Sequence, residues 1–247
     1  MTIVTSRIDE KIKILAVLED RKKKTIKEFF QRIPKKLRDT VVSVCSDLYE
    51  GFINSAKEVF GKSIRVVVDR FHVAKLYRKY VDTIRKEELR RLKKELSEEE
   101  YLKLKGLMWA LRKSKLSDKE KEILKIAFKH SAKLKEVYDF SNQLTKILDT
   151  QTTRNGGIRR LRNWISKVKE SDATYFKTFI GTLEKHIEEI ANYFTERESS
   201  GFVEGFNNRI KVLKRRCYGI VDRVHLFRRI SLDIGGHQAS PVLIDGL

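Results

Sequence analysis

Hydrophobic positions divide the chain into a first part with short apolar runs and a long middle part with helical periodicity. Apolar runs with the length of strands occur at 2–6, 12–18, 41–45 and 64–68. Two segments between them have the spacing of amphipathic helices: 24–32 and 52–60. Because run length and periodicity are the main sequence signals of secondary structure, the predicted order is strand, strand, helix, strand, helix, strand. The polar residues at 7–11 predict a hairpin turn.

The middle of the chain carries no further strand signal from residue 71 to about 198. Helices are predicted at 73–96, 98–112, 118–147, 157–169 and 173–194. Trp109 and Trp164 lie on helical faces and are expected in the core. The pattern therefore predicts an α/β fold with a large helical insertion.

Charge points to an anionic partner. The chain has 54 Lys and Arg against 34 Asp and Glu over 247 residues, a net charge of +20, and the basic runs are spread along the sequence. Such a basic body is typical of nucleic-acid binding. Cys45 and Cys217 lack metal-ligand spacing and are interpreted as core residues of a protein from a reducing compartment. No apolar run approaches the about 18 residues of a membrane span, so we expect a cytoplasmic protein without a membrane partner.

Two acids follow the apolar runs of strand length. Asp47 follows 41–45, and Asp69 follows 64–68. In open α/β sheets the carboxyl ends of the strands form the edge where ligands collect. The alternative is that each Asp caps the following helix, and the local sequence by itself favours capping for Asp47. Beside Asp69, Arg70 would pair locally, and His72 could contact a phosphate or simply be structural.

A third acid, Glu204, begins a strongly basic stretch. No acid follows it from 205 to 221. A carboxylate in this setting needs a cationic partner, and a divalent metal facing a phosphate would supply one. We therefore pair Glu204 with Asp47 as candidate metal ligands for phosphoryl transfer. The residues expected to contact DNA in this stretch are Asn207, Asn208, Lys211, Lys214, Arg215 and Arg216.

Three motifs give a family resemblance: D-R-F-H-V at 69–73, Leu-Arg-Lys at 111–113, and S-x-G-x-x-E-G-x-N-N-x-I-K-x-x-K-R-R-x-Y-G at 199–219. Together they resemble the catalytic domain of insertion-sequence transposases of the ISL-three family, over about residues 2–232. The resemblance implies an RNase-H-like core interrupted by a helical insertion, with an Asp, Asp, Glu triad that binds Mg²⁺ or Mn²⁺. Asp47 matches the second acid and Glu204 the third, while Asp69, Arg70 and His72 match supporting positions.

The chain also departs from this family. Members carry the first catalytic Asp on an upstream strand, preceded by a cysteine-rich zinc segment and a helix-turn-helix region, and none of these is present in the sequence. Asp9 is no substitute because it falls in the predicted hairpin turn. We therefore expect a truncated transposase whose RNase-H-like core lacks its first strand and whose catalysis is impaired.

The expected domains are 1–70 for the first part of the core, 71–198 for the insertion, 199–235 for the core helices with the catalytic Glu, and 236–247 for a tail. The expected function is DNA transposition by metal-dependent phosphodiester hydrolysis and strand transfer. The expected partners are transposon-end and target DNA, with a second copy or an intact transposase. One alternative is a non-catalytic DNA-binding remnant that modulates intact transposase. Another is a helical scaffold or RNA-binding protein, in which Asp47 and Glu204 would lie far apart.

Overall fold

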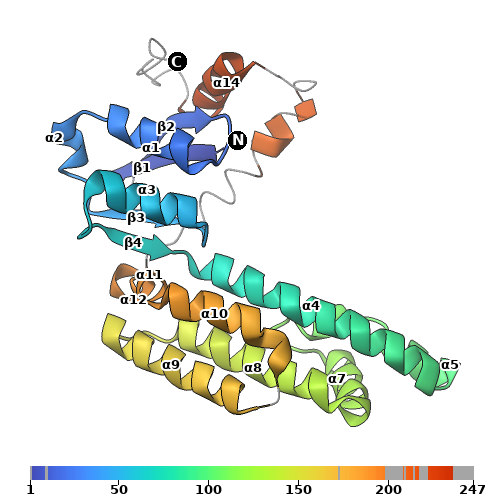
Figure 1. Cartoon of the computed structure of the whole chain (residues 1–247). Coiled ribbons are helices and arrows are strands. Elements are labelled where there is room, and N and C mark those ends of the chain that lie inside the picture. Colours follow the sequence, from blue (N-terminus) through green and yellow to red (C-terminus); the bar gives the residue numbers. More distant parts are fainter. Residues whose placement is uncertain are drawn as a thin grey trace. The chain divides into compact units, whose positions relative to one another are not determined.

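A computed structural model describes residues 2–8, 11–171, 173–197, 208, 210–213, 215–216 and 222–235. The chain divides into two compact units, which are described separately (Figure 1). Unit 1 comprises residues 1–67 and 199–247, and unit 2 comprises residues 68–198. The described residues are mostly helical with two small sheets, so the predicted α/β class holds at this level.

Unit 1 begins with the predicted hairpin. Strand β1 (Thr2–Ile8) pairs antiparallel with β2 (Lys11–Leu18), with an irregularity between Val4 and Thr5. Helix α14 (Arg223–Gly235) packs against β2. Val17 of β2 lies in a buried cluster whose other members come from the end of the chain: Ile210, Leu213, Leu226 and Ile230. The hairpin is thus covered by residues from the opposite end of the sequence.

The rest of unit 1 forms a second small α/β arrangement. Its elements are α1 (Lys23–Arg32), α2 (Lys35–Arg38), β3 (Ser43–Ser46), α3 (Glu50–Phe60) and β4 (Arg65–Val68). Strands β3 and β4 form a two-stranded sheet, and α3 lies between them in the sequence. Helices α1 and α3 pack together, with the Phe30 and Phe60 rings 5.0 Å apart. Glu58 of α3 pairs with Lys23 at 2.5 Å and with Lys27 at 2.7 Å.

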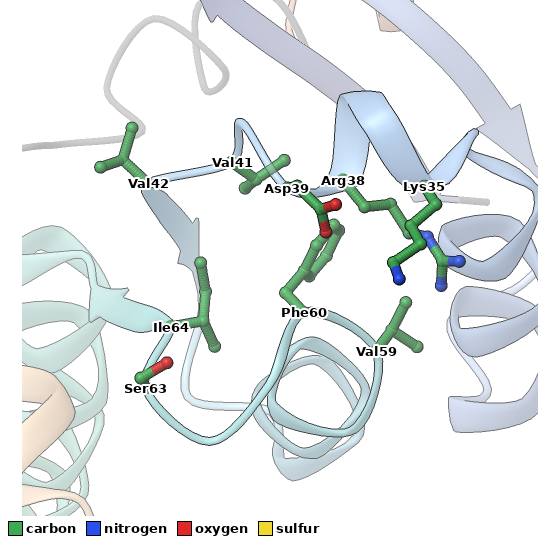
Figure 2. A pocket seen from close by; sticks show the side chains of 9 residues that line it. All are labelled: Lys35, Arg38, Asp39, Val41, Val42, Val59, Phe60, Ser63 and Ile64. Atoms are coloured by element: carbon green, nitrogen blue, oxygen red, sulfur yellow. The ribbon is translucent and has the colours of Figure 1, made fainter.

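A cavity of about 490 Å³ lies in unit 1, before β3 and beside the end of α3. Figure 2 shows Lys35 and Arg38 on one side of it and Ser63 and Ile64 on the other. Its lining is mainly apolar and basic, and Asp47 is not part of it. The cavity is therefore separate from the acid at the carboxyl end of β3.

Unit 2 is a helical assembly, and no strand lies among its described residues after β4. Its helices are α4 (Arg70–Glu95), α5 (Glu98–Leu102), α6 (Leu107–Ala110), α7 (Asp118–His130), α8 (Ala132–Asp149), α9 (Arg154–Glu170), α10 (Lys177–Lys185), α11 (Ile187–Ala191) and α12 (Tyr193–Glu196). Aromatic side chains fill its centre: the Tyr77 ring stacks on Phe176 with centroids 4.9 Å apart, and Trp164 is 2% exposed. The Trp164 indole donates a hydrogen bond to the Phe140 carbonyl at 3.1 Å, so its polar atom is satisfied.

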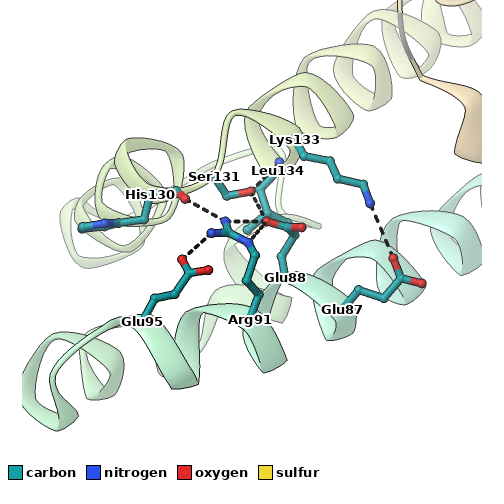
Figure 3. Close-up of polar contacts among 8 residues, drawn as sticks. All are labelled: Glu87, Glu88, Arg91, Glu95, His130, Ser131, Lys133 and Leu134. Carbon is teal, nitrogen blue, oxygen red and sulfur yellow. Dashed lines mark hydrogen bonds and ion pairs between the residues drawn. The ribbon is translucent and has the colours of Figure 1, made fainter.

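One predicted helix, 118–147, is divided at Ser131 into α7 and α8 (Figure 3). The Ser131 hydroxyl accepts the backbone N–H of Leu134 at 3.1 Å and donates to Glu88 of α4 at 2.8 Å. Arg91 donates to the His130 carbonyl at 2.9 Å and to Glu88 at 2.7 Å. Because a helix end leaves backbone groups without intrahelical partners, these contacts satisfy the groups that the break exposes.

Two further expectations differ from the structure. The segment predicted as one helix at 98–112 is divided by Gly106, whose φ of +99° is left-handed and favours glycine. Trp109 follows this turn and is 59% exposed, so its assignment to the core was wrong, whereas that of Trp164 is confirmed. The predicted helix 173–194 is interrupted at His186, where φ is −117° and ψ is 23°.

None of the described helices is both long enough and apolar enough to cross a membrane.

Candidate active site

Asp47 lies directly after β3, and both of its carboxylate oxygens have partners. Oδ1 accepts the Tyr49 backbone N–H at 2.9 Å, and Oδ2 accepts Arg21 Nη2 at 3.1 Å. The side chain is 26% exposed. Helix α3 begins after Tyr49, which makes no side-chain capping bond, so Asp47 is not the N-cap of that helix. Its carboxylate is thus held in the turn and remains open to solvent.

Arg21 lies over aromatic rings beside Asp47. Its guanidinium carbon is 4.4 Å from the centroid of the Tyr49 ring and 5.6 Å from that of Phe52. The two rings meet edge to face with centroids 5.3 Å apart. A Cβ on Gly51 would come within 2.2 Å of the Tyr49 ring, so the absence of a side chain at Gly51 leaves room for that ring. We call Tyr49 and Phe52 the aromatic platform.

Asp69 differs from Asp47 in both its solvent exposure and its hydrogen-bond partners. It is the N-cap of α4, with Oδ1 accepting the Phe71 N–H at 2.8 Å, and it is 1% exposed. The capping interpretation is therefore confirmed for Asp69. Arg70 pairs with Asp149 at the end of α8, not locally as expected, and its guanidinium carbon lies 5.0 Å from the Phe71 ring centroid. His72, on the first turn of α4, is half-buried.

The basic stretch near the end of the chain is described in part. Glu204, Asn207 and Lys214 lie outside the described residues. The described residues of 208–216 are helical, and Ile210 and Leu213 are buried in the cluster with Val17. The exposed ones include four expected to contact DNA: Asn208, Lys211, Arg215 and Arg216. This segment therefore turns apolar residues to the core of unit 1 and polar and basic residues to solvent.

The fit to a divalent cation depends on the donor atoms. No cluster of three or more His, Cys, Asp or Glu suited to a metal ion occurs among the residues that the structure describes, a set that excludes Glu204. Asp47 offers a carboxylate at the end of a strand, and hard divalent cations prefer such oxygens. The Arg21 guanidinium already lies against Oδ2, so a metal ion at that oxygen would have to displace it. Asp69 does not fit this role because it is buried and caps a helix.

Comparison with known proteins gives the family. The DDE transposase model of the ISL3 (ISL-three) type, described as "Transposase", matches residues 1–230. The chain belongs to the ISL3 family of transposases. It is similar to the transposase for insertion sequence element IS1001 of Bordetella parapertussis, with 24% identity over 238 residues. The match covers 96% of this chain and 57% of that relative, so the chain spans little more than half of the relative's length. No solved structure matches this ISL3-family chain.

Sequence analysis missed Arg21 as a neighbour of Asp47. Arg21 begins the basic run 21–24, and nothing local distinguishes it from Lys22 to Lys24. The contact joins residues 26 positions apart and forms only once β2 and α3 are placed in unit 1. The one local signal was the glycine at position 51, two residues after Tyr49, where a side chain would displace the ring.

Proposed function

We propose that this ISL3-family chain contributes an RNase-H-like core and its helical insertion to DNA transposition. The core would be formed by 1–70 and 199–235, the insertion by 71–198, and 236–247 would be a tail. Membership of the transposase family supports the DNA role. The unit formed by residues 1–67 and 199–247 is consistent with a core assembled from both ends of the sequence. The first acid of the triad, and the strand that carries it, remain unassigned.

The metal ligands of this proposal are Asp47 and Glu204. When bound, two divalent cations, Mg²⁺ or Mn²⁺, would act on a phosphodiester, one activating the attacking oxygen and the other stabilising the leaving oxygen. Asp47 is suited to binding because its turn fixes the carboxylate through the Tyr49 N–H while leaving it open to solvent. Asp69 would support the site by fixing the start of α4, with Arg70 and His72 on the same turn.

The basic stretch after Glu204 would hold the nucleic acid. Lys and Arg side chains neutralise phosphates and release counterions, which makes such binding salt-dependent. Ile210 and Leu213 anchor this segment in unit 1, so the exposed residues beside them keep a defined position. The proposed phosphate contacts are Lys211, Lys214, Arg215 and Arg216, and Asn207 and Asn208 would position the backbone or the DNA.

The observation that carries the proposal is the contrast between two acids that both follow strands. Asp47 keeps an accessible carboxylate at the end of β3, whereas Asp69 is buried by its capping role. Of these two acids, Asp47 is therefore better placed to meet a cation and a phosphate.

The test is nicking and strand transfer on a supercoiled plasmid that carries the DNA flanking the coding sequence, with Mn²⁺ or Mg²⁺. If Asp47 and Glu204 hold the metal, we expect metal-dependent nicking that Asp47→Ala and Glu204→Ala each abolish. Asp39→Ala, a change of an exposed acid outside the proposed site, should leave nicking unchanged. Metal-independent nicking, or nicking that survives both substitutions, would contradict the proposal.

A second candidate function is DNA binding without catalysis, with modulation of an intact transposase through mixed complexes. The net charge of +20 and the exposed basic residues of 208–216 favour it. Binding would then weaken steeply with added salt and would not respond to Mg²⁺ or to Asp47→Ala. Fluorescence anisotropy with labelled duplex DNA between 50 and 200 mM salt, roughly the range over which phosphate contacts are lost, separates the two functions.

A further inference from the structure

Arg21 pairs with the Asp47 carboxylate, which is a metal ligand in the proposed function. Its Nη2 lies 3.1 Å from Oδ2 of Asp47, while Oδ1 is bound by the Tyr49 N–H. The Arg21 side chain is 56% exposed and that of Asp47 is 26% exposed. A divalent cation that used Oδ2 would meet the positive guanidinium, and two like charges on one oxygen repel each other.

Arg21 also contacts the aromatic platform, independently of Asp47. Its guanidinium carbon is 4.4 Å from the Tyr49 ring centroid, close enough for a cation–π contact. Phe52 widens the platform at 5.6 Å. These contacts do not depend on the carboxylate of Asp47. If Oδ2 is released, Arg21 therefore remains beside the site rather than moving freely into solvent.

The ion pair between Arg21 and Asp47 is also weak enough for a divalent cation to displace Arg21. Ion pairs between partly exposed side chains contribute little to stability, because water screens the charges and holding two side chains together costs entropy. A divalent ion carries twice the charge and binds carboxylate oxygen directly. A divalent ion that is also bound by a second carboxylate would therefore replace Arg21 at Oδ2 of Asp47.

We propose that Arg21 is a positioning residue that holds the Asp47 carboxylate in the metal-free protein and yields Oδ2 to a divalent cation, while staying on the aromatic platform. This inference rests on the proposed metal role of Asp47. It assigns Arg21 two states: an ion pair with Asp47 without metal, and stacking on Tyr49 and Phe52 with metal. In the second state its guanidinium is available to a phosphate oxygen of the DNA.

The test measures Mn²⁺ binding to the full chain by isothermal titration calorimetry, without DNA. Arg21→Gln removes the competing charge and should tighten Mn²⁺ binding by about two- to five-fold, the range expected for loss of an exposed ion pair. Arg21→Lys keeps the charge and should bind Mn²⁺ like the unchanged protein. Lys62→Gln, an exposed lysine of unit 1, controls for net charge and should have no effect.

Two further variants distinguish an error in the metal role of Asp47 from an error in the role of Arg21. Asp47→Ala should abolish Mn²⁺ binding, and unchanged binding in that variant would overturn the metal role of Asp47 itself. If Asp47→Ala abolishes binding but Arg21→Gln leaves it unchanged or weaker, the metal role stands and the inference about Arg21 is wrong. Arg21→Ala provides a second uncharged variant in case Arg21→Gln folds poorly, and the rise in Tm on adding Mn²⁺ gives an independent measure of binding.

Discussion

At the scale of single residues, Asp47 and Asp69 show how identical side chains after two strands acquire different roles. The backbone after β4 turns directly into α4, so Asp69 becomes its N-cap and is buried. After β3, three residues intervene before α3 begins at Glu50, and the Asp47 carboxylate accepts hydrogen bonds from the Tyr49 N–H and from Arg21. Sequence reasoning could identify both acids as strand-end residues. It could not say which one stays accessible, because that depends on the path of the following turn.

Glu58 makes unit 1 sensitive to acid. Hydrogen bonds from Lys23 and then Lys27 lower the pKa of Glu58 from 4.5 to about 2. Because this pKa is lower in the folded than in the unfolded chain, the stabilisation is fully present above pH 4.5 and is lost as the pH falls towards 2. We expect Glu58→Gln to lower Tm at pH 6 and to reduce the further fall in Tm between pH 4.5 and about 2.5.

The matched control is Glu28→Gln on α1, where the Lys24 ammonium lies 3.9 Å from the carboxylate. Circular dichroism melts across the same pH series provide the measurement. An unchanged pH dependence in Glu58→Gln, or an equal loss in Glu28→Gln, would show that the link between α1 and α3 does not cause the acid sensitivity.

At the scale of elements, the helix break at Ser131 shows why periodicity alone misplaces boundaries. Residues 118–147 keep helical spacing throughout, so the sequence predicts one helix. The break is stabilised from α4, by Glu88 and Arg91, which lie about 40 positions earlier. A local pattern cannot reveal a partner on another helix. The serine itself was the available signal, since serine favours N-caps.

Glu88 should stabilise this junction far more than its neighbour Glu87. Burial raises the pKa of Glu88, but hydrogen bonds from Arg91 and Ser131 outweigh it, so the pKa lies below its ordinary value of 4.5. The carboxylate is therefore charged at neutral pH. Glu88→Gln weakens the charged contacts with Arg91 and leaves Ser131 with a poorer partner, so we expect unit 2 to lose about 1–3 kcal/mol.

Glu87→Gln is the control, because it makes the same chemical change one position earlier, where Lys133 lies 3.5 Å away and the side chain is 53% exposed. Its cost should be below about 0.5 kcal/mol, as is usual for exposed sites. Urea unfolding followed by tryptophan fluorescence reports on unit 2, whose Trp164 is buried. Equal losses in the two variants would contradict the assigned role of Glu88.

Two glycines in helices of unit 2 should respond to alanine in opposite directions. A Cβ at Gly157 of α9 would lie 2.2 Å from the Phe194 ring, whereas a Cβ at Gly181 of α10 would meet nothing within 4 Å. Alanine is the better helix former by about 1 kcal/mol. We expect Gly181→Ala to stabilise unit 2 by about 0.5–1 kcal/mol. Gly157→Ala should destabilise it by about 1–3 kcal/mol through the clash with Phe194.

Urea unfolding of both variants checks this pair. The comparison is informative because the substitution is the same and only the surroundings differ. Stabilisation by Gly157→Ala would mean that α12 moves away from α9 without cost, and that their close approach contributes little to the packing of unit 2.

At the scale of the whole molecule, the elements and the family were readable from the sequence, while the contacts were not. The hairpin at 2–18 is confirmed, since β1 and β2 pair antiparallel along their whole length. The family suggested by the motifs at 69–73 and 199–219 is confirmed by the family model that matches residues 1–230. Arg21, Gly106 and the junction at Ser131 escaped prediction, since each depends on tertiary packing or on one backbone angle. The roles of Asp47 and Glu204 stay predictions.

The division of unit 1 between the two ends of the sequence has a consequence for biosynthesis. Val17 is made early, yet its buried partners Ile210, Leu213, Leu226 and Ile230 leave the ribosome about 200 residues later. At roughly 5–20 residues per second, the nascent hairpin waits on the order of 10 s or more with its apolar face uncovered. The whole of unit 2 is synthesised within that interval. The nascent chain should therefore depend on chaperones until α14 has been translated.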